Sequence, residues 1–166
     1  DLNLQGSIQA GTSAVDIDCT SFGRPVGIGA SAVDSQTQMT LSGTEMENIV
    51  ANGLDIGGRN CGTQEVNGVT NSNTQSISGI MTMTIKFDDA RAVFIGDQST
   101  FNILAVQADN GVILRTDVTT TGGSMFLDGD IEGSSTADGT NTVGFTDGRT
   151  VTAKLQMTLV ARESII

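Results

Sequence analysis

Short segments in which apolar and polar residues alternate are the feature that most constrains the fold of this chain. In "MTMTIKF" (Met81–Phe87) every odd-numbered residue is apolar and every even-numbered residue is polar. Because successive side chains of a β-strand point to opposite faces, this pattern predicts strands with one buried face. The same alternation occurs in Leu2–Gln9, Ala14–Asp18, Gln38–Gly43 and Thr150–Ala161, and shorter strand phrases occur in Phe101–Gln107, Val112–Arg115 and Ser124–Leu127. The sequence therefore predicts an all-β chain.

The spacing of these segments narrows the architecture. Glycine-containing turns separate them, and the strands return about every 8–12 residues, as in β-sandwiches, barrels and solenoids. The chain has 21 Gly, one Pro and neither Trp nor Tyr, whereas a sandwich core usually contains these large aromatic residues. We therefore expect a right-handed parallel β-helix of about 7 coils, each of roughly 20–25 residues. A β-sandwich of the pilin type is the alternative.

Helix-forming segments are nearly absent. The window "GTEMENIVANG" (Gly43–Gly53) is the exception, because Thr44 followed by Glu47 imitates a capping box. It predicts one short helical turn.

Length and charge limit the function. A chain of 166 residues predicts a single domain, residues 1–166, either complete or one segment of a longer repeat protein. Nineteen acidic residues against eight Lys and Arg give a net charge of -11, which argues against nucleic-acid binding. No apolar run approaches the roughly 20 residues needed to cross a bilayer, so membrane insertion is not expected.

The residue types also argue against catalysis. The chain has no His and only two Cys. It therefore lacks most of the side chains that bind zinc, and it lacks the histidine that activates a nucleophile. Paired carboxylates can hydrolyse glycosides, but the Trp or Tyr platforms that usually hold the sugar are missing. We expect a protein that is not an enzyme.

Cys19 and Cys61 allow one disulfide, two buried thiols or bonds to other chains. The acidic, Lys-poor, Thr-rich composition is typical of extracellular proteins, in which cysteines are oxidised. We therefore predict that both cysteines are oxidised, either to each other or to neighbouring chains, in an extracellular or cell-surface protein.

Three longer segments carry a family resemblance: residues 54–83 ("LDIGGRNCGTQEVNGVTNSNTQSISGIMTM"), 99–130 ("STFNILAVQADNGVILRTDVTTTGGSMFLDGD") and 135–159 ("STADGTNTVGFTDGRTVTAKLQMTL"). They resemble β-helical repeats of giant secreted or cell-surface proteins of microalgae and other microbes, which are similar to filamentous-haemagglutinin-type adhesins. The resemblance covers roughly residues 37–159. It implies a rod, surface coat or adhesive filament, and no catalytic residues.

A second resemblance supports the alternative fold. Two cysteines 42 positions apart after an alternating N-terminal strand resemble the disulfide and donor strand of chaperone-usher pilins. The C-terminal segment, however, lacks the aromatic ending typical of those subunits.

The segment "LDGDIEG" (Leu127–Gly133) places Asp128, Asp130 and Glu132 as in the first half of a calcium-binding loop. Position 12 of such a loop would be Gly139, so the usual bidentate Glu is missing. We predict a solvated acidic turn first and, second, a calcium site formed by Asp128, Asp130, Glu132 and Asp138. Apart from calcium no cofactor is expected.

We predict a non-catalytic subunit or repeat of an extracellular filament or surface layer, whose partners are copies of itself or related repeat proteins. The contact residues should lie in the first and last strands: Leu2, Leu4, Ile8, Leu155, Met157 and Leu159. The alternative function is an adhesin that binds glycan on a face rich in threonine, such as Thr82 with Thr84 or Thr150 with Thr152. The six methionines are expected to fill the core.

Overall fold

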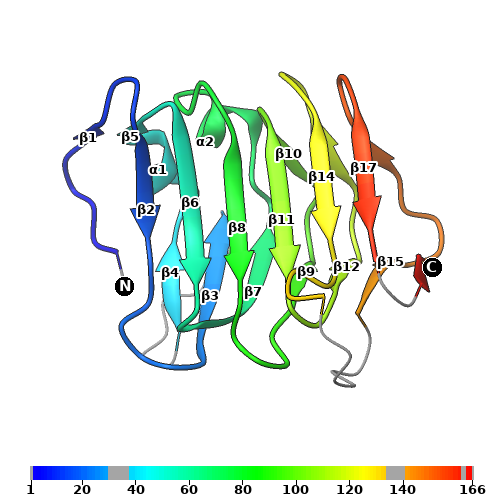
Figure 1. Cartoon of the computed structure of the whole chain (residues 1–166). Helices are drawn as coiled ribbons and strands as arrows, with labels where there is room; N and C mark the ends of the chain where they lie inside the picture. Colours follow the sequence, from blue (N-terminus) through cyan, green and yellow to red (C-terminus); the bar gives the residue numbers. More distant parts are fainter. Residues whose placement is uncertain (1, 30–37, 134–140, 162–163, 166) are drawn as a thin grey trace.

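A computed structural model describes residues 2–29, 38–133, 141–161 and 164–165, and its chain winds into a parallel β-helix. Every strand pair is parallel, which confirms the solenoid and makes the pilin-type sandwich wrong. In Figure 1 the chain descends the front sheet, returns upward behind it and advances from left to right, so the winding is right-handed. Right-handed crossovers are the rule for parallel strands.

The front sheet has six strands in the order β17-β14-β11-β8-β6-β2. They are β2 (Ala14–Ile17), β6 (Gly53–Gly58), β8 (Met81–Ile85), β11 (Leu104–Ala108), β14 (Met125–Asp128) and β17 (Met157–Val160).

The back sheet has seven strands in the order β18-β15-β12-β9-β7-β3-β4. They are β3 (Arg24–Gly29), β4 (Met39–Leu41), β7 (Cys61–Asn67), β9 (Ala92–Phe94), β12 (Val112–Leu114), β15 (Thr142–Phe145) and β18 (Ser164–Ile165).

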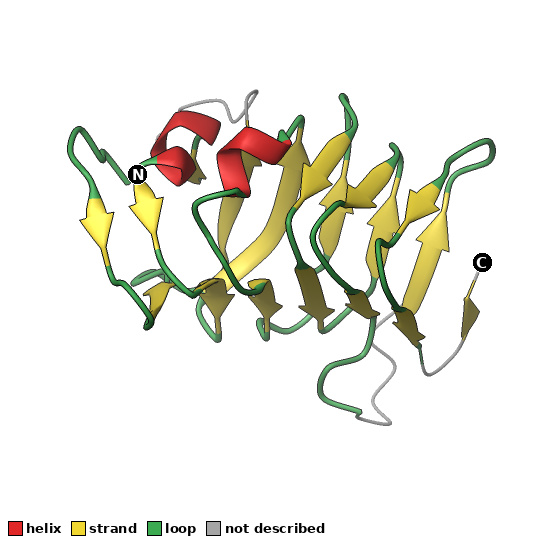
Figure 2. Ribbon diagram, turned by 90° about the horizontal axis from the view of Figure 1, so that it is seen from above, coloured by secondary structure: helices red, strands yellow, loops and turns green. Residues whose placement is uncertain are grey.

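A third side closes each coil, as the view from above in Figure 2 shows. Near the C-terminus it is a sheet of β10 (Ser99–Phe101), β13 (Val118–Thr120) and β16 (Val151–Thr152). Near the N-terminus it contains the pair β1 (Ile8–Gln9) and β5 (Ile49–Val50) and two short helices, α1 (Gly43–Glu47) and α2 (Asn71–Thr74).

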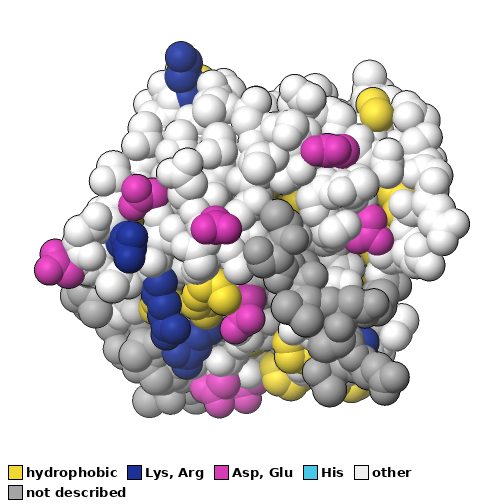
Figure 3. Space-filling view, turned by 180° about the vertical axis from the view of Figure 1, so that it is seen from behind, with side chains coloured by type: hydrophobic (Ala, Val, Ile, Leu, Met, Phe, Trp, Pro, Cys, Tyr) yellow, Lys and Arg dark blue, Asp and Glu magenta, His cyan; other side chains and the backbone are white. Residues whose placement is uncertain are grey.

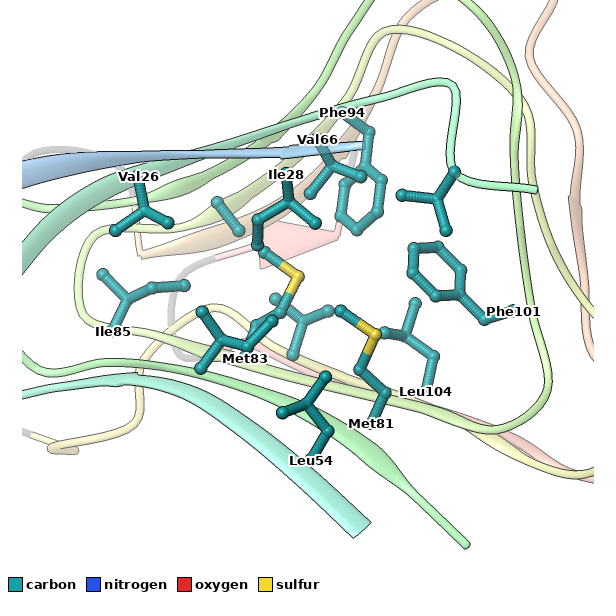
Figure 4. Close-up of a cluster of buried hydrophobic side chains, with 14 of the residues drawn as sticks. Val26, Ile28, Leu54, Val66, Met81, Met83, Ile85, Phe94, Phe101 and Leu104 are labelled. Carbon is teal, nitrogen blue, oxygen red and sulfur yellow. The ribbon is translucent and has the colours of Figure 1, made fainter. Parts of the chain in front are cut away.

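The interior is a stack of apolar side chains in ladders. In the front sheet one inward row joins Val15, Leu54, Met81, Leu104, Met125 and Met157, and the next joins Ile17, Ile56, Met83, Val106, Leu127 and Leu159. Figure 4 shows Met81 and Met83 facing residues of the back sheet such as Val66 and Phe94. Phe94 and Phe101 meet edge to face, with ring centroids 6.3 Å apart. The expectation that methionine fills this core is confirmed for Met81, Met83 and Met125, each at most 1% exposed.

The expected repeat of about 7 coils, each of roughly 20–25 residues, is confirmed only in part. The first front-sheet row contains six rungs, and successive rungs are separated by 39, 27, 23, 21 and 32 residues, so the expected length holds for two of the five intervals. The first coil is longest because the chain, after β3, places β4 on the N-terminal side of β3 before it advances. A solenoid tolerates such insertions because they leave the stacked strands in register.

The predicted short helix is present as α1, but its cap differs from the expected one. Ser42, not Thr44, is the N-cap: its hydroxyl accepts from the Glu45 backbone N–H, and the Glu45 carboxylate accepts from the Ser42 N–H at 2.8 Å. Helix α2 was not expected. The Thr70 backbone N–H before it donates to the Asn73 side chain at 2.8 Å.

Several predicted strands are interrupted. The segment Phe101–Gln107 divides between β10 and β11, and Thr150–Ala161 divides between β16 and β17. Of the segment Leu2–Gln9 only β1 is a strand. The interruptions between β10 and β11 and between β16 and β17 are corners where the chain changes sheet.

Asparagine side chains link the corners of successive coils. The Asn60 amide donates to the Cys19 carbonyl at 3.0 Å, and the Asn102 amide donates to the Ile77 carbonyl at 3.0 Å. These bonds satisfy backbone oxygens that the sheets leave unpaired at the turns.

Candidate functional site

The two ends of the solenoid differ from its middle in their apolar surface. Among the described residues, the partly buried apolar side chains that pack against the core are Leu2, Leu4, Ile8, Ala10, Val15, Ile17, Phe87, Phe145, Val151, Ala153, Leu159 and Ala161. All except Phe87 lie in residues 2–17 or 145–161. An interior rung is covered by the coils before and after it, whereas an end rung has only one neighbour. Each end therefore presents an inward-facing apolar layer that the described residues leave partly uncovered.

The C-terminal end is the more exposed. Leu155 is 75% exposed, Met157 37% and Val160 41%. Strand β17 pairs with β14 on one side and is the edge of the front sheet on the other. It contains no charged residue, although edge strands are commonly protected by charges, Pro or bulges.

The N-terminal end is partly covered by its own first residues. The Leu2 N–H donates to the Thr40 carbonyl at 3.4 Å, the Leu4 N–H to Glu45 Oε1 at 3.3 Å and the Ile8 N–H to the Asn48 carbonyl at 2.9 Å. The residues proposed from the sequence as contacts thus divide into two sets: Leu2, Leu4 and Ile8 at this end, and Leu155, Met157 and Leu159 at the other.

The strand at the N-terminal edge of the front sheet, β2, carries acidic residues. Asp16 lies within β2 and Asp18 follows it, and both are exposed. Asp16 is the register partner of Asp55 on β6. Burial raises the pKa of Asp55 above its ordinary value of 3.8. A hydrogen bond donated by the Thr84 hydroxyl at 2.8 Å lowers this pKa in part, and the negative charge of Asp16 raises it further.

Sequence reasoning missed the Asp16–Asp55 pair. The signal was present, because "VDI" (residues 15–17) and "LDI" (54–56) repeat one pattern. Aligning these two triplets would have placed the two carboxylates on neighbouring coils.

A depression of about 350 Å³ lies along the corners between the front and back sheets. It is lined by Arg59, Lys86, Asp109, Ile131 and Glu132, so both signs of charge are present. Asp109 is buried, and its carboxylate accepts from the Asp89 backbone N–H at 2.8 Å. Figure 3 shows Lys and Arg side chains near acidic and apolar ones on the rear face, without an extended patch of one sign.

The acidic turn uses its carboxylates for its own backbone. Asp128 Oδ1 accepts from the Asp130 N–H and Asp130 Oδ1 accepts from the Gly133 N–H, both at 3.1 Å. Desolvation raises the pKa of Asp128. Glu132 contributes to the depression beside Arg59, and Asp138 lies outside the described residues. In the described part of the chain no three acidic or cysteine residues form a group that could hold a metal, so the calcium site stays a prediction.

Threonine forms a ladder on only one of the expected faces. Thr82 lies between Asp55 and Ala105 in its row, so the front sheet has no threonine row there. On the third side Thr152 pairs with Thr119, and Thr119 with Thr100, which gives a row across three coils. Thr150 precedes β16 and lies outside this row.

Cys19 and Cys61 form a disulfide with each other. It ties the corner after β2 to the start of β7, and both residues are buried, at 4% and 0% exposure. The prediction that both cysteines are oxidised is confirmed, and of the two predicted connections it is the bond within the chain that forms. The disulfide indicates an oxidising compartment. Within the described residues, no helix has the length and apolar character required to cross a membrane.

Comparison of this chain with protein-family models, with curated proteins and with solved structures finds no match. The fold and its surface are therefore the observations on which a function can be based.

Proposed function

We propose that this chain is a non-catalytic structural unit of an extracellular filament or surface layer, and that the units associate through coil ends and sheet edges. The observation that carries this proposal is the concentration of incompletely buried apolar side chains at the two ends. Burying such a layer against another coil removes apolar surface from water, worth about 25 cal/mol per Å². A free edge strand adds unpaired backbone N–H and C=O groups that another strand satisfies.

The remaining features are compatible with an assembly role. The disulfide suits an oxidising, extracellular setting. The sequence resemblance to β-helical repeats of giant cell-surface proteins supports the same kind of function, in which a rod serves as a building element.

Association of the purified protein tests this proposal. We expect the sedimentation coefficient to rise with concentration, and electron microscopy to show rods longer than one solenoid. Met157→Lys should abolish the association because it places a charge on the open edge. Ile80→Lys is the matched control: Ile80 is 43% exposed but directly precedes the interior strand β8, so this variant should associate like the wild type. A wild-type protein that stays monomeric at every concentration would overturn the proposal.

Glycan binding is the second candidate, because the row Thr100–Thr119–Thr152 is a regular hydroxyl surface. A glycan array decides it: binding by the monomer that is lost in Thr119→Val would favour an adhesin.

A further inference from the structure

We propose that the depression along the corner that follows β6, β8 and β11 binds a sugar acid, that is, a molecule with one carboxylate and several hydroxyl groups. This inference goes beyond the proposed assembly function and does not depend on it. It starts from the residues that line the depression: Arg59, Lys86, Asp109, Ile131 and Glu132.

The pairing of the front sheet continues past the ends of its strands and sets these side chains in order. The Lys86 N–H donates to the carbonyl of the last residue of β6 at 3.1 Å, and the Asp109 N–H donates to that of β8 at 2.9 Å. The Ile131 N–H donates to the carbonyl of the last residue of β11 at 3.1 Å. Arg59 directly follows β6. Because neighbouring strands lie about 4.8 Å apart, these four residues form a row along the solenoid axis.

The row begins with two cations on neighbouring coils. Both Arg59 and Lys86 are exposed, and Lys86 also lowers the pKa of the Asp55 carboxyl. A guanidinium group can bind a carboxylate through two parallel hydrogen bonds, and an ammonium group adds a third donor. A carboxylate that contacts both cations also reduces the repulsion between them. This end of the depression therefore suits the acid group of a ligand.

The row continues with hydrogen-bond acceptors and an apolar side chain. Asp109 is 3% exposed, and its carboxylate accepts from the Asp89 N–H at 2.8 Å, whereas Glu132 is exposed. Ionised carboxylates only accept hydrogen bonds, so they bind donors such as hydroxyl groups. A hydroxyl brings one donor, whereas an ammonium group brings three. Because the Asp109 carboxylate is already partly used, hydroxyl groups fit better than the ammonium group of an amino acid. Ile131 provides apolar surface for the C–H groups of a sugar ring.

Size and charge limit the ligand further. The depression has a volume of about 350 Å³, at the lower end of the range of about 300–1,000 Å³ for small-molecule sites, which suits a single sugar residue. The net charge of -11 repels an anion at long range. The affinity must therefore come from local contacts with Arg59 and Lys86.

Titrations followed by saturation-transfer NMR test the site, at a protein concentration low enough to prevent association. The probe is galacturonic acid, and galactose is its matched control because it has the same ring without the carboxylate. Acetate provides the carboxylate without hydroxyl groups, and alanine provides a zwitterion. We expect galacturonate to bind at least roughly ten-fold more tightly than each of the three, as hydrogen bonds to charged groups allow.

Substitutions assign the binding to the depression. Arg59→Gln and Lys86→Gln should each weaken galacturonate binding roughly ten-fold, because each removes a charged donor to the carboxylate. Lys154→Gln is the matched control: it removes the same charge from an exposed position that does not line the depression, so it should bind like the wild type. Circular-dichroism melting curves check that each variant is folded.

The outcomes decide between the possible ligands. Equal affinity of the wild type and Arg59→Gln for galacturonate, or equal affinity of the wild type for galactose and galacturonate, would overturn the role of the cations. Binding of acetate or alanine as tight as that of galacturonate would overturn the sugar acid as the ligand. Absence of saturation transfer to galacturonate would overturn the inference and leave the proposed assembly standing.

The same titration with oligogalacturonate identifies the source of the sugar acid. If binding to the oligomer is tighter than to the monomer and is lost in Arg59→Gln, the ligand is a unit within an acidic polysaccharide. If only the monomer binds and the same substitution removes that binding, the ligand is a free sugar acid. Either result supports the site.

Discussion

The same substitution at two successive rungs of one ladder measures how open the C-terminal end is. Leu127 and Leu159 are neighbours in the row that begins at Ile17. Leu127 is fully buried between Val106 and Leu159, whereas Leu159 is packed on one side only and is partly exposed. We therefore expect Leu→Ala to cost very different amounts at the two positions.

The magnitudes follow from the packing. Leu127→Ala leaves a cavity closed by both neighbouring rungs, and such substitutions cost about 2–5 kcal/mol of unfolding free energy. Leu159→Ala removes a side chain that is already partly in water and leaves no closed cavity. Its cost should be roughly half as large, about 1–2 kcal/mol.

Urea unfolding followed by circular dichroism measures both values, at a protein concentration low enough to prevent association. Because the two variants make the same chemical change in neighbouring strands, the difference in strand propensity cancels. Equal losses of stability would refute the argument that the last rung is uncovered. At high concentration the effect of the two variants on association should be the opposite of their effect on stability. Leu159→Ala should weaken association, and Leu127→Ala should leave it unchanged.

Three further predictions concern the rest of the molecule. Replacing both cysteines by Ser opens a loop with a sequence separation of 42 residues and should lower the unfolding free energy by roughly 4 kcal/mol on the chain-entropy model; a melting curve identical to that of the wild type would contradict this. Because the folded-state pKa of Asp55 is raised above 3.8, its contribution to stability is fully present below the unfolded-state pKa and is lost as the pH rises through the folded-state pKa. The stability of the wild type relative to Asp55→Asn should therefore fall as the pH rises from 3.5 to about 7 in urea titrations, and a constant difference would show that the carboxyl is not perturbed. If Asp128, Asp130 and Glu132 bind calcium, chelator should lower the melting temperature through loss of a native-state ligand, and an unchanged curve would leave only an acidic turn.

The sequence alone determined the local structure and its repetition. Alternation in Met81–Phe87 correctly placed Met81, Met83 and Ile85 in the core, because the two-residue period of a strand is set by the backbone of that strand alone. Short strands, glycine turns and the lack of Trp and Tyr were sufficient to favour a parallel solenoid over a sandwich. A short helix was expected in the right window, although its cap was placed two residues too late.

Only the tertiary structure decided the corners, the register and the ends. The alternation continues through the corner at Ala153–Gln156 without a glycine, so the sequence could not divide β16 from β17. Which rungs are neighbours depends on pairing between residues about 20–40 positions apart. Because the coils differ in length, a search for a repeat of fixed length cannot find these pairs. The Asp16–Asp55 pair and the Cys19–Cys61 bond both follow from this register. The exposure of Leu155 and Met157 also follows from their position in the stack. A strand with the same apolar pattern is buried where a coil covers it on each side, and it is exposed at the end of the stack, where one of these coils is missing.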